Sequence, residues 1–242
     1  MKKTSISLKL TLDLVMAVLF MVCMGFRLTV ETTHEWAGIV LFTLLSLHAW
    51  FNWSWYRNLF KGKYTFRRVV NTVVNLCLVG LIVLLLIGGL MNAHLLKFLE
   101  LKGGMQFREW HTFAAYWSLV LVGIHIGMHW SMITGTIRKW TGNTLGGPGI
   151  VLSLRLLGVA LVVFGVWASF DREMGSKLFL GFGFDYWNPE RPAALFYIST
   201  FSVMALYVFI THCALRLVKR ISGWLTGTYR TTSGEASTGI QN

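Results

Sequence analysis

The protein has 242 residues, of which 55% are hydrophobic and 13% charged, with a mean hydropathy of +0.58. The few charges cluster between long apolar runs, which excludes a soluble globular fold, because such a fold needs a charged surface. The net charge of +12 has no soluble basic face to carry it, so no nucleic-acid partner is expected. The composition predicts a polytopic membrane protein surrounded by lipid.

Six apolar runs are long enough to cross a bilayer, which takes about 20 residues. The first run follows a basic start but has no A-x-A-like cleavage site, so it is interpreted as a helix and not as a cleaved signal. We therefore expect an all-α integral membrane protein with six transmembrane helices. In chain order they lie near Leu8–Phe26, Thr32–Trp53, Val69–Asn92, Trp110–Thr134, Gly149–Phe170 and Pro192–Val218.

The loops between these runs orient the chain. With the N-terminus inside, the inner segments carry fourteen basic residues, and the outer segments carry seven together with most of the acidic residues. This positive-inside bias predicts that both termini are cytoplasmic. We expect a multi-pass protein of a bacterial inner membrane, whose positive charge also attracts anionic lipid.

The second and fourth runs share a repeated pattern. Residues 34–53 (HEWAGIVLFTLLSLHAWFNW) and 111–130 (HTFAAYWSLVLVGIHIGMHW) each open with His and place another His fourteen residues later. Fourteen residues rise about 21 Å along a helix and return to within about 40° of the same face. Since the two helices run in the same direction, we expect two stacked imidazole pairs: His34 with His111 near the outer surface, and His48 with His125 near the inner surface.

Two pairs of histidines between helices suit bis-histidine haem. Two imidazoles fill both axial positions of the iron, which favours electron transfer over oxygen chemistry. Gly38 and Ala115, one turn below the outer histidines, leave room for a porphyrin edge. Arg27 and Arg108 lie where haem propionates could point. No Cys-x-x-Cys-His motif is present, which excludes covalent attachment and predicts two haems of b type.

Alternatives remain for individual histidines. His129 lies five turns after His111 and is the alternative to His125 as inner ligand, but the repeat favours His125, since the counterpart of His129 is Asn52. His212 lies at a similar depth to His129. Together with Asp13 they form a candidate quinone site, and His129 with His212 could instead bind a third haem. Packing roles and binding of another metal are the remaining interpretations.

The first and third runs also look like repeat partners, with Asp13 and Asn75 at similar inner depth. Asp13 is expected either to transfer protons or to form a hydrogen bond or cap. The predicted organisation is a four-helix di-haem cytochrome b bundle over residues 8–134, a two-helix membrane extension over 149–218, and a disordered cytoplasmic tail over 219–242.

Three segments, TLDLVMAVLFMV, HEWAGIVLFTLLSLHAWFNWSWY and REWHTFAAYWSLVLVGIHIGMHW, resemble the flavinylation-associated cytochrome family, long described only as a domain of unknown function. The resemblance covers roughly residues 8–134. It implies a membrane cytochrome that carries electrons beside extracytosolic flavin-binding or other redox proteins, and the arrangement is similar to respiratory cytochrome b. Family members often end both ligand helices with His-x-x-x-His; here His125 and His129 keep the pair, but the first copy has His48 and Asn52.

We therefore expect a membrane di-haem b-type cytochrome acting as the electron-transfer subunit of an oxidoreductase complex. It would carry electrons between a quinone pool or inner donor and an extracytosolic flavoprotein, iron–sulfur protein or multihaem cytochrome. That partner is expected to dock over the loops at residues 27–35, 93–109 and 171–191. One alternative is the quinone-reactive anchor of a respiratory hydrogenase, formate dehydrogenase or thiosulfate reductase. Another is a metal-binding transporter or assembly protein.

Overall fold

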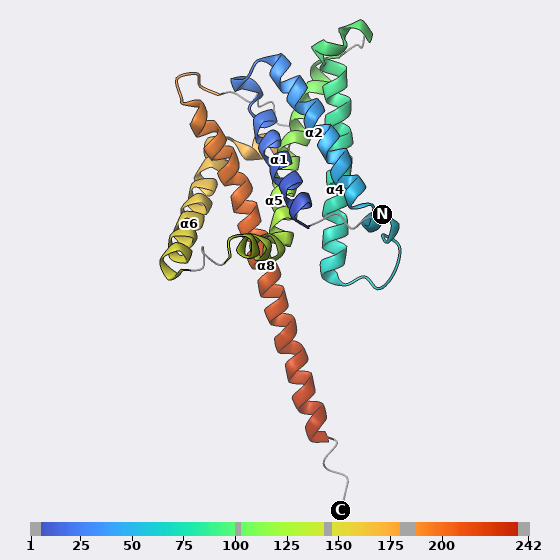
Figure 1. Ribbon diagram of the computed structural model, residues 1–242, viewed down its shortest axis with the longest axis vertical. Coiled ribbons are helices and arrows are strands. Elements are labelled where there is room, and N and C mark those ends of the chain that lie inside the picture. The colour runs from blue at the N-terminus through green and yellow to red at the C-terminus, as the bar shows by residue number, and fades with distance from the viewer. Residues whose placement is uncertain (1–5, 100–102, 143–146, 180–186, 237–242) are drawn as a thin grey trace, which may run out of the picture.

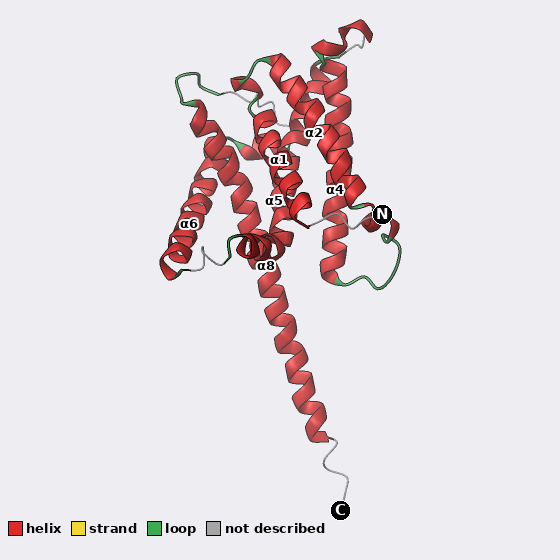
Figure 2. Ribbon diagram, in the orientation of Figure 1, coloured by secondary structure: helices red, strands yellow, loops and turns green. Residues whose placement is uncertain are grey.

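The computed structural model describes residues 6–99, 103–142, 147–179 and 187–236, and within these ranges it contains helices and loops but no strand (Figure 2). Two short 3-10 helices, η1 and η2, follow α1 and α4. In chain order the elements are α1 (Ile6–Met24), η1 (Phe26–Leu28), α2 (Glu31–Phe51), α3 (Trp53–Arg57), α4 (Phe66–Asn92), η2 (His94–Leu99), α5 (Met105–Trp140), α6 (Pro148–Asp171), α7 (Met174–Leu178) and α8 (Ala193–Ala236).

Five helices, α1, α4, α5, α6 and α8, are long and apolar enough to cross a membrane. Many of their apolar side chains are exposed on the isolated chain, as expected where lipid covers a helix. The prediction of an all-helical, multi-pass membrane protein is confirmed at this level. α2 has the required length of 21 residues, but two glutamates and two histidines make it less apolar, and it is not one of the five.

Consecutive long helices run in opposite directions (Figure 1). The connections after α1, α4 and α6 lie at the upper end in that view, and the connections after α2 and α5 lie at the lower end. The upper end corresponds to the loops predicted to be outer. α2 and α5 therefore run the same way, as the positions of their histidines require.

The packed core of the described residues lies where α5 meets α6, α7 and α8. α5 approaches α8 closely at Gly123 and Gly127, where an added Cβ would lie 2.8 Å from Met204 O and 2.7 Å from Val208 O respectively. Small residues at a helix interface allow this close approach of backbones. The buried cluster comprises Met24, Tyr116, Leu119, Ala168, Met174, Trp187, Phe196, Val203 and Met204.

α8 is much longer than a membrane span. Its 44 residues correspond to about 66 Å of helix, against roughly 30 Å for a hydrocarbon core, and its C-terminal part projects beyond the other helices (Figure 1). The prediction of a disordered tail from residue 219 differs from the structure, in which the helix continues to Ala236. Extending an established helix adds one hydrogen bond per residue and avoids the cost of nucleation. Residues 237–242 of that predicted tail lie outside the described residues.

Candidate functional site

The outer histidines, His34 on α2 and His111 on α5, face each other. Their ring centroids lie 6.0 Å apart with an angle of 69° between the ring planes. Two imidazoles bound to opposite sides of one metal ion, with nitrogen–metal distances of about 2 Å, place their centroids roughly 6 Å apart. The expectation that His34 lies level with His111 is confirmed, and the spacing fits one shared ion.

A backbone carbonyl orients the outer ring on α5. The Nδ1–H of His111 donates to Leu85 O on α4 at 2.9 Å, and a carbonyl can only accept, so the lone pair of the neutral ring is on Nε2. On α2, the Cys23 backbone lies close enough to interact with His34. Nδ1 of His34 is nevertheless buried without a well-aligned hydrogen bond to any described residue.

Polar side chains orient the inner rings in the same way. The Nδ1–H of His48 donates to Asp13 Oδ1 on α1 at 2.7 Å. The Nδ1–H of His125 donates to Asn75 Oδ1 on α4 at 2.9 Å. The expectation of a hydrogen bond from Asp13 to a neighbouring helix is therefore confirmed, and Asn75 plays the matching part in the second hairpin.

These four contacts follow one internal repeat. Cys23 and Leu85, which neighbour the outer rings, are offset by 62 residues, and so are Asp13 and Asn75, which hold the inner rings. The histidines themselves are offset by 77 residues. The α1–α2 and α4–α5 hairpins thus place their histidines on the same positions of the preceding helix.

Binding Nδ1 to the protein and leaving Nε2 as the lone-pair nitrogen is how proteins prepare histidine for a metal, because the second-shell contact fixes the tautomer and the ring orientation. His48, His111 and His125 have this arrangement. Sequence reasoning placed the histidines but did not assign Asn75 as the residue that orients His125. The equivalent positions of Asp13 and Asn75 in the repeat were the available signal.

The inner site contains a third histidine. The rings of His125 and His129 lie 4.9 Å apart, and both interact electrostatically with Asp13 and His48. His129 forms no hydrogen bond with any residue that the structure describes. His48 Nε2 accepts a long 3.3 Å hydrogen bond from the Asn52 amide, which also donates to the His48 carbonyl.

The inward face of α2 is only partly covered. No residue of α2 is buried, and α2 packs chiefly on α1, whereas α4 and α5 pack closely together. A Cβ added at Gly38 would meet nothing within 4 Å. On α4, by contrast, a Cβ at Gly88 would lie 2.9 Å from Cβ of His111. The open space beside α2 is what a flat guest between the hairpins requires.

The other residues predicted to contact haem are Ala115, Arg27 and Arg108. Ala115 is partly buried against the α5–α8 core. Arg27 and Arg108 are exposed. The guanidinium of Arg27 lies 5.9 Å from the ring centroid of Phe26, and that ring packs edge-on against His34 at 5.1 Å. Arg27 is thus one side chain away from the outer pair.

The candidate quinone residues are only partly brought together. Asp13 and His129 interact electrostatically. His212, on α8, interacts with Arg216, and within the described ranges it shares no hydrogen bond or ring contact with either of them.

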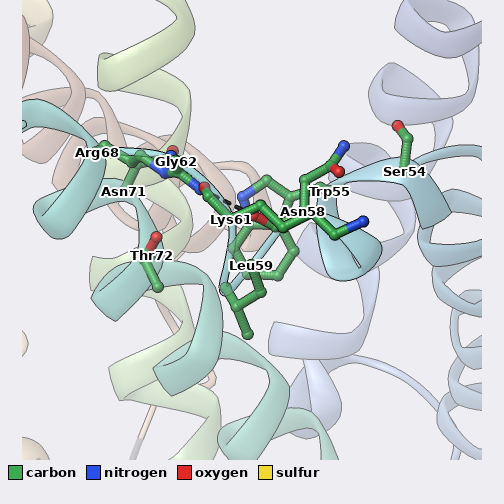
Figure 3. Close-up of a pocket in the computed structure, with 9 residues that line it drawn as sticks. All are labelled: Ser54, Trp55, Asn58, Leu59, Lys61, Gly62, Arg68, Asn71 and Thr72. Carbon is green, nitrogen blue, oxygen red and sulfur yellow. Dashed lines mark hydrogen bonds between the residues drawn. The ribbon is translucent and has the colours of Figure 1, made fainter. Parts of the chain in front are cut away.

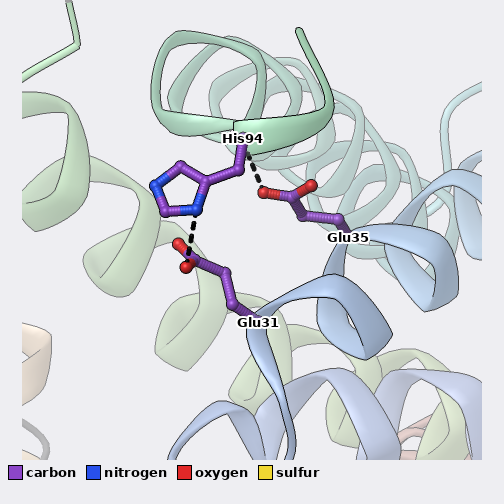
Figure 4. A group of neighbouring side chains, drawn as sticks. All are labelled: Glu31, Glu35 and His94. Carbon is purple, nitrogen blue, oxygen red and sulfur yellow. Dashed lines mark hydrogen bonds and ion pairs between the residues drawn. The ribbon is translucent and has the colours of Figure 1, made fainter. Parts of the chain in front are cut away.

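A second group of ligand-type side chains lies at the outer end (Figure 4). Glu31, Glu35 and His94 bring potential metal-ligand atoms within 4.8 Å of one another. His94 Nδ1 contacts Glu31 Oε2 at 2.7 Å, while Glu35 accepts the backbone N–H groups of His94 and Leu95 at 2.6 and 3.0 Å. These bonds tie α2 to η2 and already occupy both carboxylates.

A pocket of about 570 Å³ lies at the inner end, between α3, the following loop and α4 (Figure 3). None of the paired histidines lines it. Arg68 closes its edge by donating to the carbonyls of Asn58, Lys61 and Lys63. The pocket is formed by α3, the loop that follows it and the start of α4, and it is separate from the histidine pairs.

Comparisons with protein-family models, with curated proteins and with solved structures found no match. The function of the histidine site is therefore inferred from its own residues.

Proposed function

We propose that the protein is a membrane di-haem b-type cytochrome that transfers electrons across the membrane. The observation that carries the proposal is the repeated histidine geometry. Each hairpin holds one outer and one inner histidine. Three of the four engage Nδ1 on the preceding helix, which makes Nε2 the lone-pair nitrogen that a metal would need; in His48 this nitrogen accepts the long hydrogen bond from Asn52, which haem would displace. Haem held this way supplies a one-electron couple with no open coordination position.

In this proposal His34 and His111 hold the outer haem, and His48 and His125 hold the inner one. His125 is preferred to His129 because its Nδ1 is bonded to Asn75 and because it is the repeat counterpart of His48. The gap beside Gly38 receives a porphyrin edge on the α2 side. Ala115 is its counterpart on α5, and Arg27 and Arg108 are the candidate propionate partners near the outer surface.

α2 is the sixth transmembrane helix in this account. Its two glutamates and two histidines lower its apolar character, and polar groups inside a membrane are costly without a ligand or partner. With α2 as a span, six crossings return the chain to the side on which it began. The distribution of basic residues supports cytoplasmic termini and a bacterial inner membrane.

The two sites connect the membrane surfaces. Fourteen residues separate the histidines on each helix, which is about 21 Å along the membrane normal. Electrons pass between a quinone pool or another inner donor and an extracytosolic flavoprotein, iron–sulfur protein or multihaem cytochrome. That partner docks over the outer loops, of which residues 100–102 and 180–186 lie outside the described residues. The resemblance to the flavinylation-associated cytochrome family supports the same assignment.

The first test is a pyridine haemochrome assay on the purified full-length protein. We expect about two haems per chain, both removed by acid–acetone and both low-spin. His94→Ala and His212→Ala are matched controls, because they remove histidines outside the pairs and should keep the haem content. A colourless preparation, or haem that resists extraction, would contradict the proposal.

The quinone part is tested separately in liposomes. Addition of a quinol should reduce the haem spectrum, and a quinone-site inhibitor should slow this reduction. If no quinol reduces the protein while dithionite does, an inner protein donor replaces the quinone pool, and Asp13, His129 and His212 lose their assignment as a quinone site.

A further inference from the structure

The two histidine sites differ in the groups that their Nδ1 atoms contact. At the inner site His48 donates to a carboxylate, Asp13, at 2.7 Å. At the outer site His111 donates to a neutral backbone carbonyl, and Nδ1 of His34 makes no well-aligned hydrogen bond within the described chain. The repeat makes the contrast sharp, because Asn75 occupies the position equivalent to Asp13 and presents a neutral amide to His125.

A carboxylate on the far nitrogen changes the ligand. Accepting the Nδ1–H draws the proton away from the ring and raises the basicity of Nε2. A more strongly donating ligand stabilises oxidised iron over reduced iron, and second-shell hydrogen bonding is one of the means by which a protein sets a haem potential. Neutral carbonyl and amide acceptors have a weaker effect of the same kind.

Other charges act on both sites from farther away. Glu31 and Glu35 interact electrostatically with His34, but Glu31 is paired with His94 and Glu35 accepts two backbone N–H groups. At the inner end Arg67 interacts with His129, and its guanidinium also donates to the Met128 carbonyl. Electrostatic energy falls with distance, so direct contact of Asp13 with a ligand ring outweighs these groups.

We propose that Asp13 is a positioning residue that, through the Nδ1–H of His48, sets the reduction potential of the inner site below that of the outer site, so that electrons run from the cytoplasmic to the extracytosolic side. This inference rests on the proposed function and adds a direction to it. For each electron that an inner quinol or reduced protein loses, an oxidised extracytosolic protein gains one. No bond forms or breaks in the cytochrome.

The test is a spectroelectrochemical titration of the haem-loaded full-length protein. The wild type should show two waves. Asp13→Asn, which makes the inner site neutral on both ligands, should shift the lower wave to a more positive potential and leave the upper wave in place. Asn75→Asp, which adds a carboxylate to the second inner ligand, should shift the same wave to a more negative potential.

Glu35→Gln is the matched control, because it removes one outer carboxylate that does not contact a ligand ring. It should shift only the upper wave, and by less than Asp13→Asn shifts the lower one. If Asp13→Asn keeps both haems with unchanged potentials, or moves the upper wave, the inference is overturned. If Asp13→Asn loses the inner haem, the titration of Asn75→Asp becomes the deciding test. The absence of a negative shift of the lower wave in that variant would overturn the inference. Wild-type protein without haem would overturn the proposed function as well, so the two failures are distinct.

Discussion

The two sides of α5 are packed in different ways. On one side, α5 meets α8 so closely that a Cβ added at Gly123 or Gly127 would collide with the opposing backbone, and Phe196 and Leu119 are almost fully buried. On the other side, α5 and α4 face an α2 that has no buried residue and an open space at Gly38. The first region is held together by close contacts within the protein, including hydrogen bonds from Trp117 to Leu178 and from Arg172 to Tyr116. The second leaves space beside α2, next to hairpins whose His48, His111 and His125 are held through Nδ1 by the preceding helix.

The comparison indicates how each region is stabilised. Helices in lipid gain little from burying apolar side chains, so they associate through close packing and hydrogen bonds. The α5–α8 side obtains this from its small residues. The histidine side has interhelical hydrogen bonds at Asp13 and Asn75, but its α2 lacks comparable packing, so bound haem should supply the missing contacts between the two hairpins.

The largest expected effect is that of removing haem. Protein produced without haem should lose protection in α1 and α2 while α5, α6 and α8 stay protected, because only the histidine side depends on the guest. Hydrogen exchange in detergent, read by mass spectrometry, measures this directly. Adding haem back should restore protection of α2. Equal protection of both regions without haem would contradict the comparison.

Gly38→Leu should have the next largest effect. A Cβ at this position meets no protein atom within 4 Å, so we expect protein packing to tolerate the larger side chain, whereas a porphyrin edge beside α2 would not. We expect loss of most of the outer haem, seen as a fall from two haems per chain toward one. Gly80→Leu is the control, since that position is also open and is exposed. Full haem content in Gly38→Leu would mean that the porphyrin does not lie beside Gly38.

Gly123→Leu tests the packed side. Its side chain would collide with the Met204 backbone and with Tyr207, and overpacking costs about 1–3 kcal/mol. We expect a lower midpoint of thermal unfolding, followed by tryptophan fluorescence, with an unchanged ratio of haem to folded protein. Selective loss of one haem without a change in the midpoint would mean that the packing of α5 on α8 affects haem binding and not stability, contrary to the expected division between the two regions.

The smallest effects are expected where Glu31 and Glu35 of α2 contact η2. Glu35→Ala removes the acceptor of two backbone N–H groups and should cost about 1 kcal/mol. Glu31→Ala breaks the solvent-exposed pair with His94 and should cost roughly 0–1 kcal/mol. The same thermal measurement compares them. A large loss of stability in Glu31→Ala, with Glu35→Ala nearly unchanged, would reverse the roles given to the two carboxylates.

The sequence predicted the features that depend on local geometry. Helical periodicity alone places His34 and His48 on one face, and two helices running the same way bring His34 level with His111. The partners of the inner rings depend on how each hairpin rotates and packs. Asp13 and His48 are 35 residues apart, and Asn75 and His125 are 50 apart, so helix periodicity could not assign these contacts.

The extent of the helices was harder to predict from composition. α8 continues to Ala236 although its last part is polar, because helix propagation does not require an apolar face. α2 forms a helix of the predicted length but is not apolar enough to be identified as a span by composition. Two of the residues that lower its hydropathy, His34 and His48, are ligands in the proposed site, so the same histidines that would hold haem also weaken the membrane signal of α2.

The pairing of histidines across α2 and α5 can be tested with low-temperature haem spectra of single alanine variants. His48→Ala and His125→Ala should remove the same haem band, and His34→Ala and His111→Ala should remove the other. His129→Ala should keep both bands, because His129 has no counterpart in the first hairpin. If His129→Ala abolishes the inner band while His125→Ala keeps it, or if His48→Ala and His125→Ala remove different bands, the paired arrangement proposed here is wrong.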